Sequence, residues 1–175
     1  MPKQTQWLLV AFGAAIGLYL FSRTAPGQSA VASVTQYVGD LLTPHGIRNN
    51  NPGNIERNSI QWRGALSRAQ VEAAGLTWDP TYVQFDKPES GVRAIGHVLL
   101  AKSARGLTSV DAIIRDYSAT DQDAYVTNVS NALGVGPFDT IDVQSQLPPF
   151  ALAIIQQENG QQPYDASAVA EWVYS

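Results

Sequence analysis

The sequence predicts a mainly helical, α+β domain with one small β-hairpin region, preceded by an N-terminal transmembrane helix. Three observations carry this prediction: an uncharged run at residues 7–21, helical periodicity from residue 88 onward, and only short strand candidates between them. A chain of 175 residues is long enough to bury one core. We therefore assign residues 1–28 to an anchor and linker, and residues 29–175 to one folded domain.

The composition excludes several classes of function. The net charge is -4 and no run of Lys or Arg is present, so we expect no nucleic-acid partner. The absence of cysteine excludes disulfides, thiolate zinc sites and cysteine nucleophiles. Two histidines, His45 and His97, are too few for most catalytic zinc sites, so we expect no metal site. An enzyme with this inventory would depend on carboxylates.

The N-terminal run at residues 7–21 has the character of a membrane anchor. Trp7 and Tyr19 lie near its ends, as interfacial aromatic residues do, and Lys3 and Arg23 flank it. The run is somewhat shorter than the roughly 20 residues of a full span. A cleaved signal peptide, with a cleavage site near residues 30–32, and a buried helix are the alternatives. The flanking charges do not fix an orientation in the membrane.

Between the anchor and residue 88 we expect short elements. Pro26 and Gly27 mark a linker, and an amphipathic helix covers residues 29–43 until Pro44 ends it. A short helix is expected within residues 67–75. Residues 82–85 and the region 55–62 are the candidates for a small hairpin.

From residue 88 the pattern is helical to the end of the chain. Pro88 suits a first helical position, Thr108 and Asp165 are expected caps, and Gly134 and Gly160 are expected stops. The predicted helices cover residues 88–103, 108–117, 121–133, 150–158 and 165–173.

The segment 45–55 is rich in residues that interrupt regular structure. It contains four asparagines, two glycines and a proline. Glycine and asparagine tolerate positive φ, and Pro52 keeps Asn51 out of the helical region. The segment is either an ordinary surface loop or a binding wall that is shaped by amide hydrogen bonds.

Glu158 is the best candidate for a general acid. It continues the apolar stripe of Ala151, Ile154 and Ile155 in the last turn of its helix. Apolar surroundings and the negative end of the helix dipole both disfavour an ionised carboxyl group. Glu89, in a first helical turn, is the rival, and Glu56 is a candidate second carboxylate.

Five segments together resemble phage virion-associated, lysozyme-like proteins that open peptidoglycan. The resemblance covers about residues 44–164 and consists of Gly46-Ile47-Arg48-Asn49-Asn50-Asn51-Pro52-Gly53-Asn54-Ile55, Trp62-x-Gly64, Phe85-x-x-Pro88-Glu89-x-Gly91-Val92-Arg93-Ala94, Asp121-x-Asp123-x-Tyr125-Val126 and Ala153-Ile154-Ile155-x-x-Glu158-Asn159-Gly160. It implies a lysozyme-like fold for residues 29–175, a glycan-strand substrate and no cofactor. It also implies association with a virion, with other virion proteins as partners, and a viral or bacterial inner membrane as the place of the anchor.

A looser likeness to bacterial cell-wall glucosaminidases orders the same pieces differently. There the helix that ends in glutamate precedes the asparagine-rich stretch, whereas here Glu158 follows it, so we interpret the order as permuted. Asn159 stands where serine is usual. If the order is not permuted, Glu89 inherits the role of the acid.

The resulting hypothesis is a lytic transglycosylase or a muramidase-type hydrolase with Glu158 as general acid. The residues expected to bind substrate are Asn50, Asn51, Asn54, Trp62, Phe85 and Tyr125. Trp62, Phe85 and Tyr125 could equally be core residues. Segment 45–55 and Glu158 should then face each other across one cleft. The alternative is a non-catalytic, membrane-anchored virion or wall-binding protein of the same fold.

Overall fold

The computed structural model describes residues 42–175. The chain divides into two compact units, Met1–Thr43 and Pro44–Ser175, and the helices below belong to the second. The expected anchor at residues 7–21 and nearly all of the expected helix 29–43 lie outside the described residues, so the domain boundary at residue 29 stays a prediction. Within residues 42–175, none of the helices has the length and apolar character needed to cross a bilayer.

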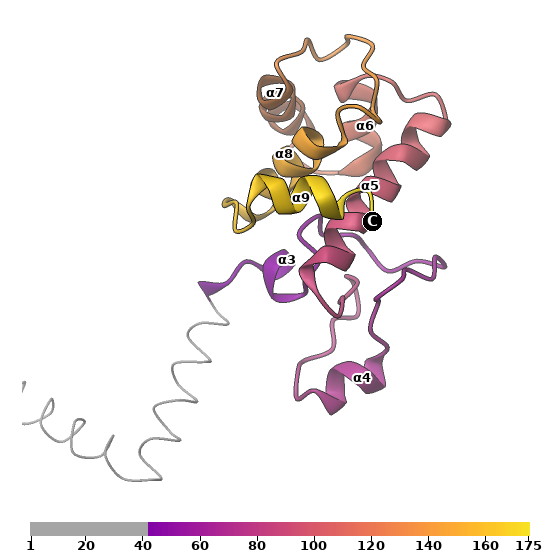
Figure 1. Ribbon diagram of the computed structural model, residues 1–175, viewed down its shortest axis with the longest axis vertical. Helices are drawn as coiled ribbons and strands as arrows, with labels where there is room; N and C mark the ends of the chain where they lie inside the picture. Colours follow the sequence, from indigo (N-terminus) through magenta and orange to yellow (C-terminus); the bar gives the residue numbers. More distant parts are fainter. Residues whose placement is uncertain (1–41) are drawn as a thin grey trace, which may run out of the picture. The chain divides into compact units, whose positions relative to one another are not determined.

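The described part is mainly helical, as predicted (Figure 1). Its helices are α3 (His45–Arg48), α4 (Arg68–Ala73), α5 (Pro88–Ala104), α6 (Val110–Tyr117), α7 (Gln122–Leu133), α8 (Leu147–Asn159) and α9 (Ala166–Trp172). All five helices predicted from residue 88 onward are present, with small shifts at their ends.

The helix ends show why these segments begin and stop where they do. Ser67 and Gln70 form a capping box at the start of α4, each side chain bonding the other residue's backbone N–H. Ser109, rather than the expected Thr108, caps α6 by accepting a hydrogen bond from Ala112 N. Gly134 and Gly160 end α7 and α8 in the left-handed conformation, with φ of 68° and 66°.

The expected β-hairpin is reduced to two isolated bridges among the described residues. Glu56 pairs with Tyr82 and Ala65 pairs with Phe85, both antiparallel. The segments around residues 55–65 and 82–85 do lie side by side. Backbone hydrogen bonds join them, from Val83 N to Ile55 O, from Arg57 N to Thr81 O and from Leu66 N to Gln84 O, but they are too scattered to form a continuous strand ladder.

Helix α8 lies at the centre of the domain and packs against α3, α5, α7 and α9. Phe150, Ile154 and Ile155 of this helix are completely buried. Fully burying a side chain of this size stabilises a fold by about 2 kcal/mol. Helix α4 lies apart from the helical cluster, at the lower end of Figure 1. The apolar stripe of α8 is therefore buried in the core, and the last turn of α8 contacts the asparagine-rich segment.

Candidate active-site cleft

A cleft of about 560 Å³ lies between the asparagine-rich region and the helical cluster. Its walls come from residues within 53–62 and Tyr82, from one face of α5, from residues 117–120 after α6, and from Glu158 at the end of α8. Segments far apart in the sequence thus meet around one concave surface. This is the arrangement expected of a binding or active site.

Glu158 is held on the cleft wall by two hydrogen bonds from different segments. Asn54 Nδ2 donates to Glu158 Oε2 at 2.9 Å, and the Tyr125 hydroxyl donates to Glu158 Oε1 at 2.9 Å. Glu158 is half-buried and Tyr125 is almost completely buried. The carboxyl group is therefore fixed in position while it stays accessible from the cleft. Segment 45–55 was expected to face Glu158 across the cleft, whereas its residue Asn54 contacts Glu158 directly.

The neighbouring residue, Asn159, fastens the end of α8 to the same loop. Its Nδ2 donates to Pro52 O at 2.7 Å and to Ile155 O at 2.9 Å, and its side chain is buried. Gly46 lies against this junction, because a Cβ there would come within 2.6 Å of Asn159 Oδ1 and 2.8 Å of Asn54 Oδ1. A close approach of this kind explains why the segment requires glycine at residue 46.

Two of the expected sugar-binding asparagines shape the loop and do not line the cleft. Asn51 is completely buried; its Nδ2 donates to Ile55 O and Val83 O, and its Oδ1 accepts from Ile55 N. Asn50, with φ of 51°, donates to Phe85 O at 3.1 Å. Asn54, with φ of 47°, is the asparagine that reaches the cleft.

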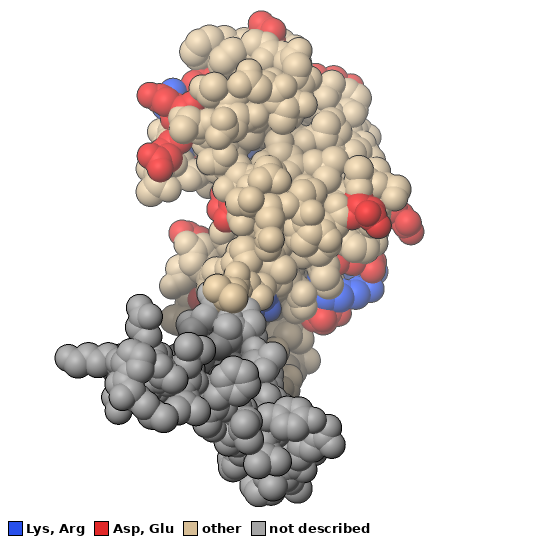
Figure 2. All heavy atoms as spheres, turned by 90° about the vertical axis from the view of Figure 1, so that its left-hand side faces the viewer, with Lys and Arg blue, Asp and Glu red and all other residues tan. Residues whose placement is uncertain are grey.

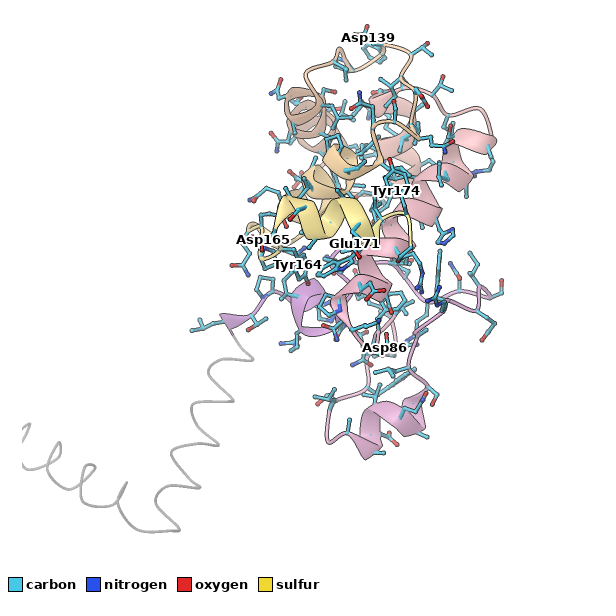
Figure 3. All side chains as sticks on the ribbon, in the orientation of Figure 1. Asp86, Asp139, Tyr164, Asp165, Glu171 and Tyr174 are labelled. Atoms are coloured by element: carbon cyan, nitrogen blue, oxygen red, sulfur yellow. The ribbon has the colours of Figure 1, made fainter. Side chains whose placement is uncertain are left out.

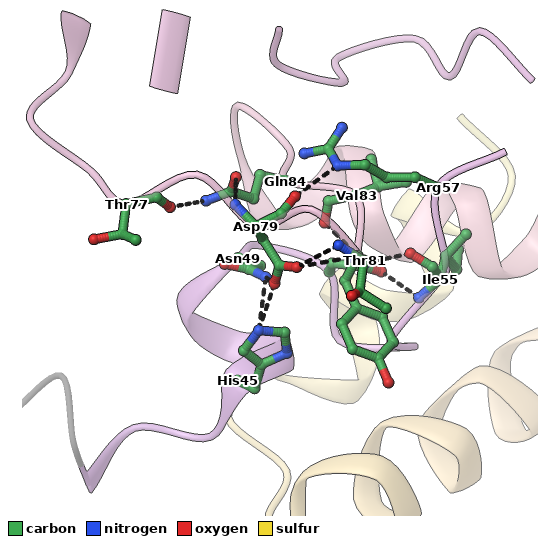
Figure 4. Close-up of polar contacts among 11 residues, drawn as sticks. His45, Asn49, Ile55, Arg57, Thr77, Asp79, Thr81, Val83 and Gln84 are labelled. Carbon is green, nitrogen blue, oxygen red and sulfur yellow. Dashed lines mark hydrogen bonds and ion pairs between the residues drawn. The ribbon is translucent and has the colours of Figure 1, made fainter. Parts of the chain in front are cut away.

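A second polar network, missed by the sequence analysis, ties the same loop to residues 77–84 (Figure 4). Its centre is Asp79. Oδ2 of Asp79 pairs with His45 Nε2 at 2.5 Å and accepts from Asn49 Nδ2 at 2.7 Å, while Oδ1 accepts from the backbone N–H groups of Thr81 and Tyr82 at 2.9 Å. Burial raises the pKa of Asp79, but these hydrogen bonds and His45 outweigh it, so the net pKa is below its usual value. An aspartate in a loop gives no periodic signal by which sequence could identify this role.

Two tyrosines support the base of the cleft. The Tyr117 hydroxyl donates to Gly53 O at 2.7 Å, and the Tyr117 and Tyr125 rings meet edge to face at 6.4 Å. Burial, together with the charge of Glu158, raises the pKa of both phenols well above the usual value. Both hydroxyls therefore stay protonated at neutral pH and act as donors.

The other residues predicted for the site lie in different parts of the domain, some in the cleft and some outside it. Glu89 does not line the cleft; it pairs with Lys87 at 2.8 Å in the first turn of α5. Glu56 is exposed and lines the cleft together with Trp62. Phe85 belongs to the hydrophobic core. Glu56, rather than Glu89, is thus the carboxylate that shares the cleft with Glu158.

Other acidic side chains of the described part lie away from the cleft. Figure 3 shows Asp86, Asp139, Asp165 and Glu171 at separate places on the domain; all four are exposed and none lines the cleft. On the face drawn in Figure 2, acidic and basic side chains are scattered among uncharged ones. Residues 42–175 contain no group of three or more His, Asp or Glu side chains that could hold a metal ion.

Comparison with known proteins connects this helical, cleft-bearing chain to the proteins of bacteriophages. The chain is 32% identical over 126 residues to Protein P5 of Pseudoalteromonas phage PM2, which corresponds to 68% of this chain and 73% of the phage protein. The chain therefore belongs to the same family as Protein P5. No protein-family model matches the sequence. The name Protein P5 states no activity, so the family relation assigns none.

Proposed function

We propose that this protein cleaves the glycan strand of peptidoglycan, with Glu158 as the general acid. The observation that carries the proposal is the position of Glu158 on the cleft wall, where Asn54 and Tyr125 fix both of its oxygens. Geometry comes first in identifying a general acid, because its carboxyl must reach the leaving oxygen of a bound substrate. The resemblance of five segments to lysozyme-like proteins of phage virions supports the same function.

In this mechanism a glycan strand lies along the cleft, and Glu158 protonates the glycosidic oxygen as an oxocarbenium-like state forms. Trp62 offers an aromatic face for a sugar ring, and Asn54 fixes the acid. In a hydrolase, Glu56 on the same cleft would direct the attacking water. In a lytic transglycosylase, the substrate's own hydroxyl or acetamido group would complete the reaction, and Glu56 would not be needed.

The proposal extends to a lysozyme-like fold and to a place in the virion. A family relation to a phage protein supports a role in phage particles. A virion-associated, membrane-anchored enzyme that opens the wall locally during phage entry would fit this relation, with residues 7–21 as the anchor and other virion proteins as neighbours.

The test compares two variants with the wild type on purified peptidoglycan. Glu158→Gln should lower the rate of turbidity loss by about 10²- to 10⁴-fold, the usual contribution of a general acid. Glu89→Gln, outside the cleft, is the matched control and should keep the wild-type rate. Circular dichroism checks that each variant is folded. If Glu158→Gln equals an active wild type, Glu158 is not the acid.

Fragment analysis then separates the two reaction types. A transglycosylase releases anhydro ends and should tolerate Glu56→Gln, whereas a hydrolase releases reducing ends and should lose most activity in this variant. Mass spectrometry of the released fragments distinguishes the two products.

The second candidate is a wall-binding protein without catalysis. The observation that favours it is that both oxygens of Glu158 already accept hydrogen bonds from the protein, which would also suit a purely structural glutamate. This protein would sediment with insoluble peptidoglycan and release no fragments, and Glu158→Gln would weaken the fold without changing any product.

A further inference from the structure

One face of α5 forms a basic wall of the cleft. On this side the cleft is lined by His97, Val98, Ala101 and Lys102 of α5 and by Arg105, the residue that caps its C-terminal end. Their spacing places them in one stripe along the helix. Three of these five residues, His97, Lys102 and Arg105, have basic side chains, whereas the acidic residues of the cleft, Glu56 and Glu158, come from other segments. The charge of the cleft therefore differs between its walls.

The cations of this wall are held in place by one acid. Lys102 Nζ donates to Asp116 Oδ2 at 2.6 Å and to Asp116 O at 2.7 Å, and Arg105 pairs with the same Oδ2. The hydrogen bond from Lys102 holds the pKa of Asp116 below its usual range. Two cations and one carboxylate leave this trio with a positive charge at neutral pH.

The trio has one buried and one accessible member. Lys102 is 7% exposed, which fixes its ammonium group close to the Tyr117 ring at 5.5 Å. The Arg105 side chain is 59% exposed and carries donors that Asp116 does not use. Exposed His97 lies on the same stripe, two turns before Arg105. An anionic group in the cleft would find a prepositioned partner here.

We propose that the α5 wall binds the free carboxylates of the peptide stems, so that the preferred substrate is a peptide-bearing strand. This inference rests on the proposed glycan-cleaving function. The sugar rings of a peptide-substituted strand carry no charge, so a neutral strand would gain nothing from cations along the cleft. The stems carry carboxylates on the side of the strand, and the α5 wall lines the same cleft as Glu158.

The experiment varies the charge on both sides of this contact. One substrate is purified peptidoglycan; the other is the same material with its carboxyl groups converted to neutral amides by a carbodiimide and ammonia. Arg105→Gln removes the accessible charge and keeps a polar side chain. Arg68→Gln, exposed on α4 and not lining the cleft, is the matched control.

Wild type should lose about two- to fivefold in kcat/KM on the amidated substrate, the size expected when one partly exposed charge contact is removed. Arg105→Gln should show a similar loss on untreated peptidoglycan and no further loss on amidated material. Arg68→Gln should behave as wild type. Because the variant and the chemical change remove the same contact, their effects should not add.

Equal rates of wild type on both substrates would overturn the inference and leave the proposed function intact. An Arg105→Gln variant that keeps the full wild-type sensitivity to amidation would also overturn it. If neither substrate is cleaved, the proposed function fails, and sedimentation with the two insoluble materials at low and high salt still decides whether α5 recognises carboxylates.

Discussion

Glu158 owes its position to donors that neither its own helix nor its neighbours in sequence supply. Asn54 contacts one carboxyl oxygen and Tyr125 the other, each at 2.9 Å. Removing either donor should cost about the net worth of one hydrogen bond, because Glu158 lines the cleft and its freed oxygen can be reached by water. The Tyr125 hydroxyl is the cleaner of the two to remove, since phenylalanine keeps the ring.

Tyr125→Phe should lower the free energy of unfolding by about 1 kcal/mol, the usual worth of one buried hydrogen bond. It should also slow peptidoglycan cleavage, because Glu158 loses one of its two fixed partners. Urea denaturation and the turbidity assay measure the two effects.

Tyr164→Phe is the matched control for this prediction. The Tyr164 hydroxyl is buried and has no hydrogen-bond partner within residues 42–175, so its removal should leave stability unchanged or slightly raised. An equal cost for Tyr164→Phe and Tyr125→Phe would mean that the hydrogen bond to Glu158 contributes nothing beyond the loss of a hydroxyl group.

At the scale of single residues, the helical period predicted the position of Glu158 but not its hydrogen-bond partners. The stripe of α8 placed Glu158 correctly next to buried Ile154 and Ile155. Which asparagine turns into the cleft depends on positive φ at Asn50 and Asn54 and on carbonyl groups more than thirty residues away. Asp79 was missed for the same reason, since its partners come from a loop distant in sequence.

Two glycines of α5, Gly91 and Gly96, allow two other parts of the chain to pack closely against this helix. A Cβ on Gly91 would collide with Asn50 O and lie 2.8 Å from Pro52 Cδ, while a Cβ on Gly96 would collide with Val173 O. The first contact seats the asparagine-rich segment, and the second seats the end of the chain. Glycine is less favourable than alanine in a helix, but at both positions it leaves room for the close contact.

Gly91→Ala and Gly96→Ala should each lower the free energy of unfolding, by about 1–3 kcal/mol from overpacking. In an unhindered helix, alanine would instead stabilise by about 1 kcal/mol. Only Gly91→Ala should also slow cleavage, because it displaces the segment that leads to Asn54. Thermal denaturation and the turbidity assay test the pair, and a stabilising Gly96→Ala would contradict the contact with Val173.

At the scale of elements, sequence periodicity predicted the helices well and the β region poorly. Helices α5 to α9 repeat an apolar face every three to four residues, so their core contacts are visible in the sequence. The segment from residue 55 to 85 is held by scattered backbone hydrogen bonds and by the side chains of Asn51 and Gln84, with two bridges in place of a ladder. Such bonds have no period, and the predicted hairpin overstated the regular structure.

The second compact unit contains its own core. The buried cluster runs from Ile55 to Val173 and includes residues of α5, α6, α7, α8 and α9. Each unit of this kind is expected to fold by itself when its apolar surface is buried internally.

A fragment of residues 44–175 should therefore fold without residues 1–43. We expect a helical circular dichroism spectrum, one cooperative thermal transition and cleavage of purified peptidoglycan at the full-length rate. A fragment that is helical but melts without cooperativity would show that residues 1–43 complete the core.

The hydrogen bond between Asn54 and Glu158 joins residues that are 104 positions apart in the chain. During synthesis, the asparagine-rich segment leaves the ribosome long before the carboxyl group that it will hold. The cleft is therefore completed only when α8 has been translated, after the helices between have emerged. A truncated product that ends before α8 would keep the asparagine-rich segment and α5 but lack Glu158, so under the proposed function an unfinished chain would not cleave peptidoglycan.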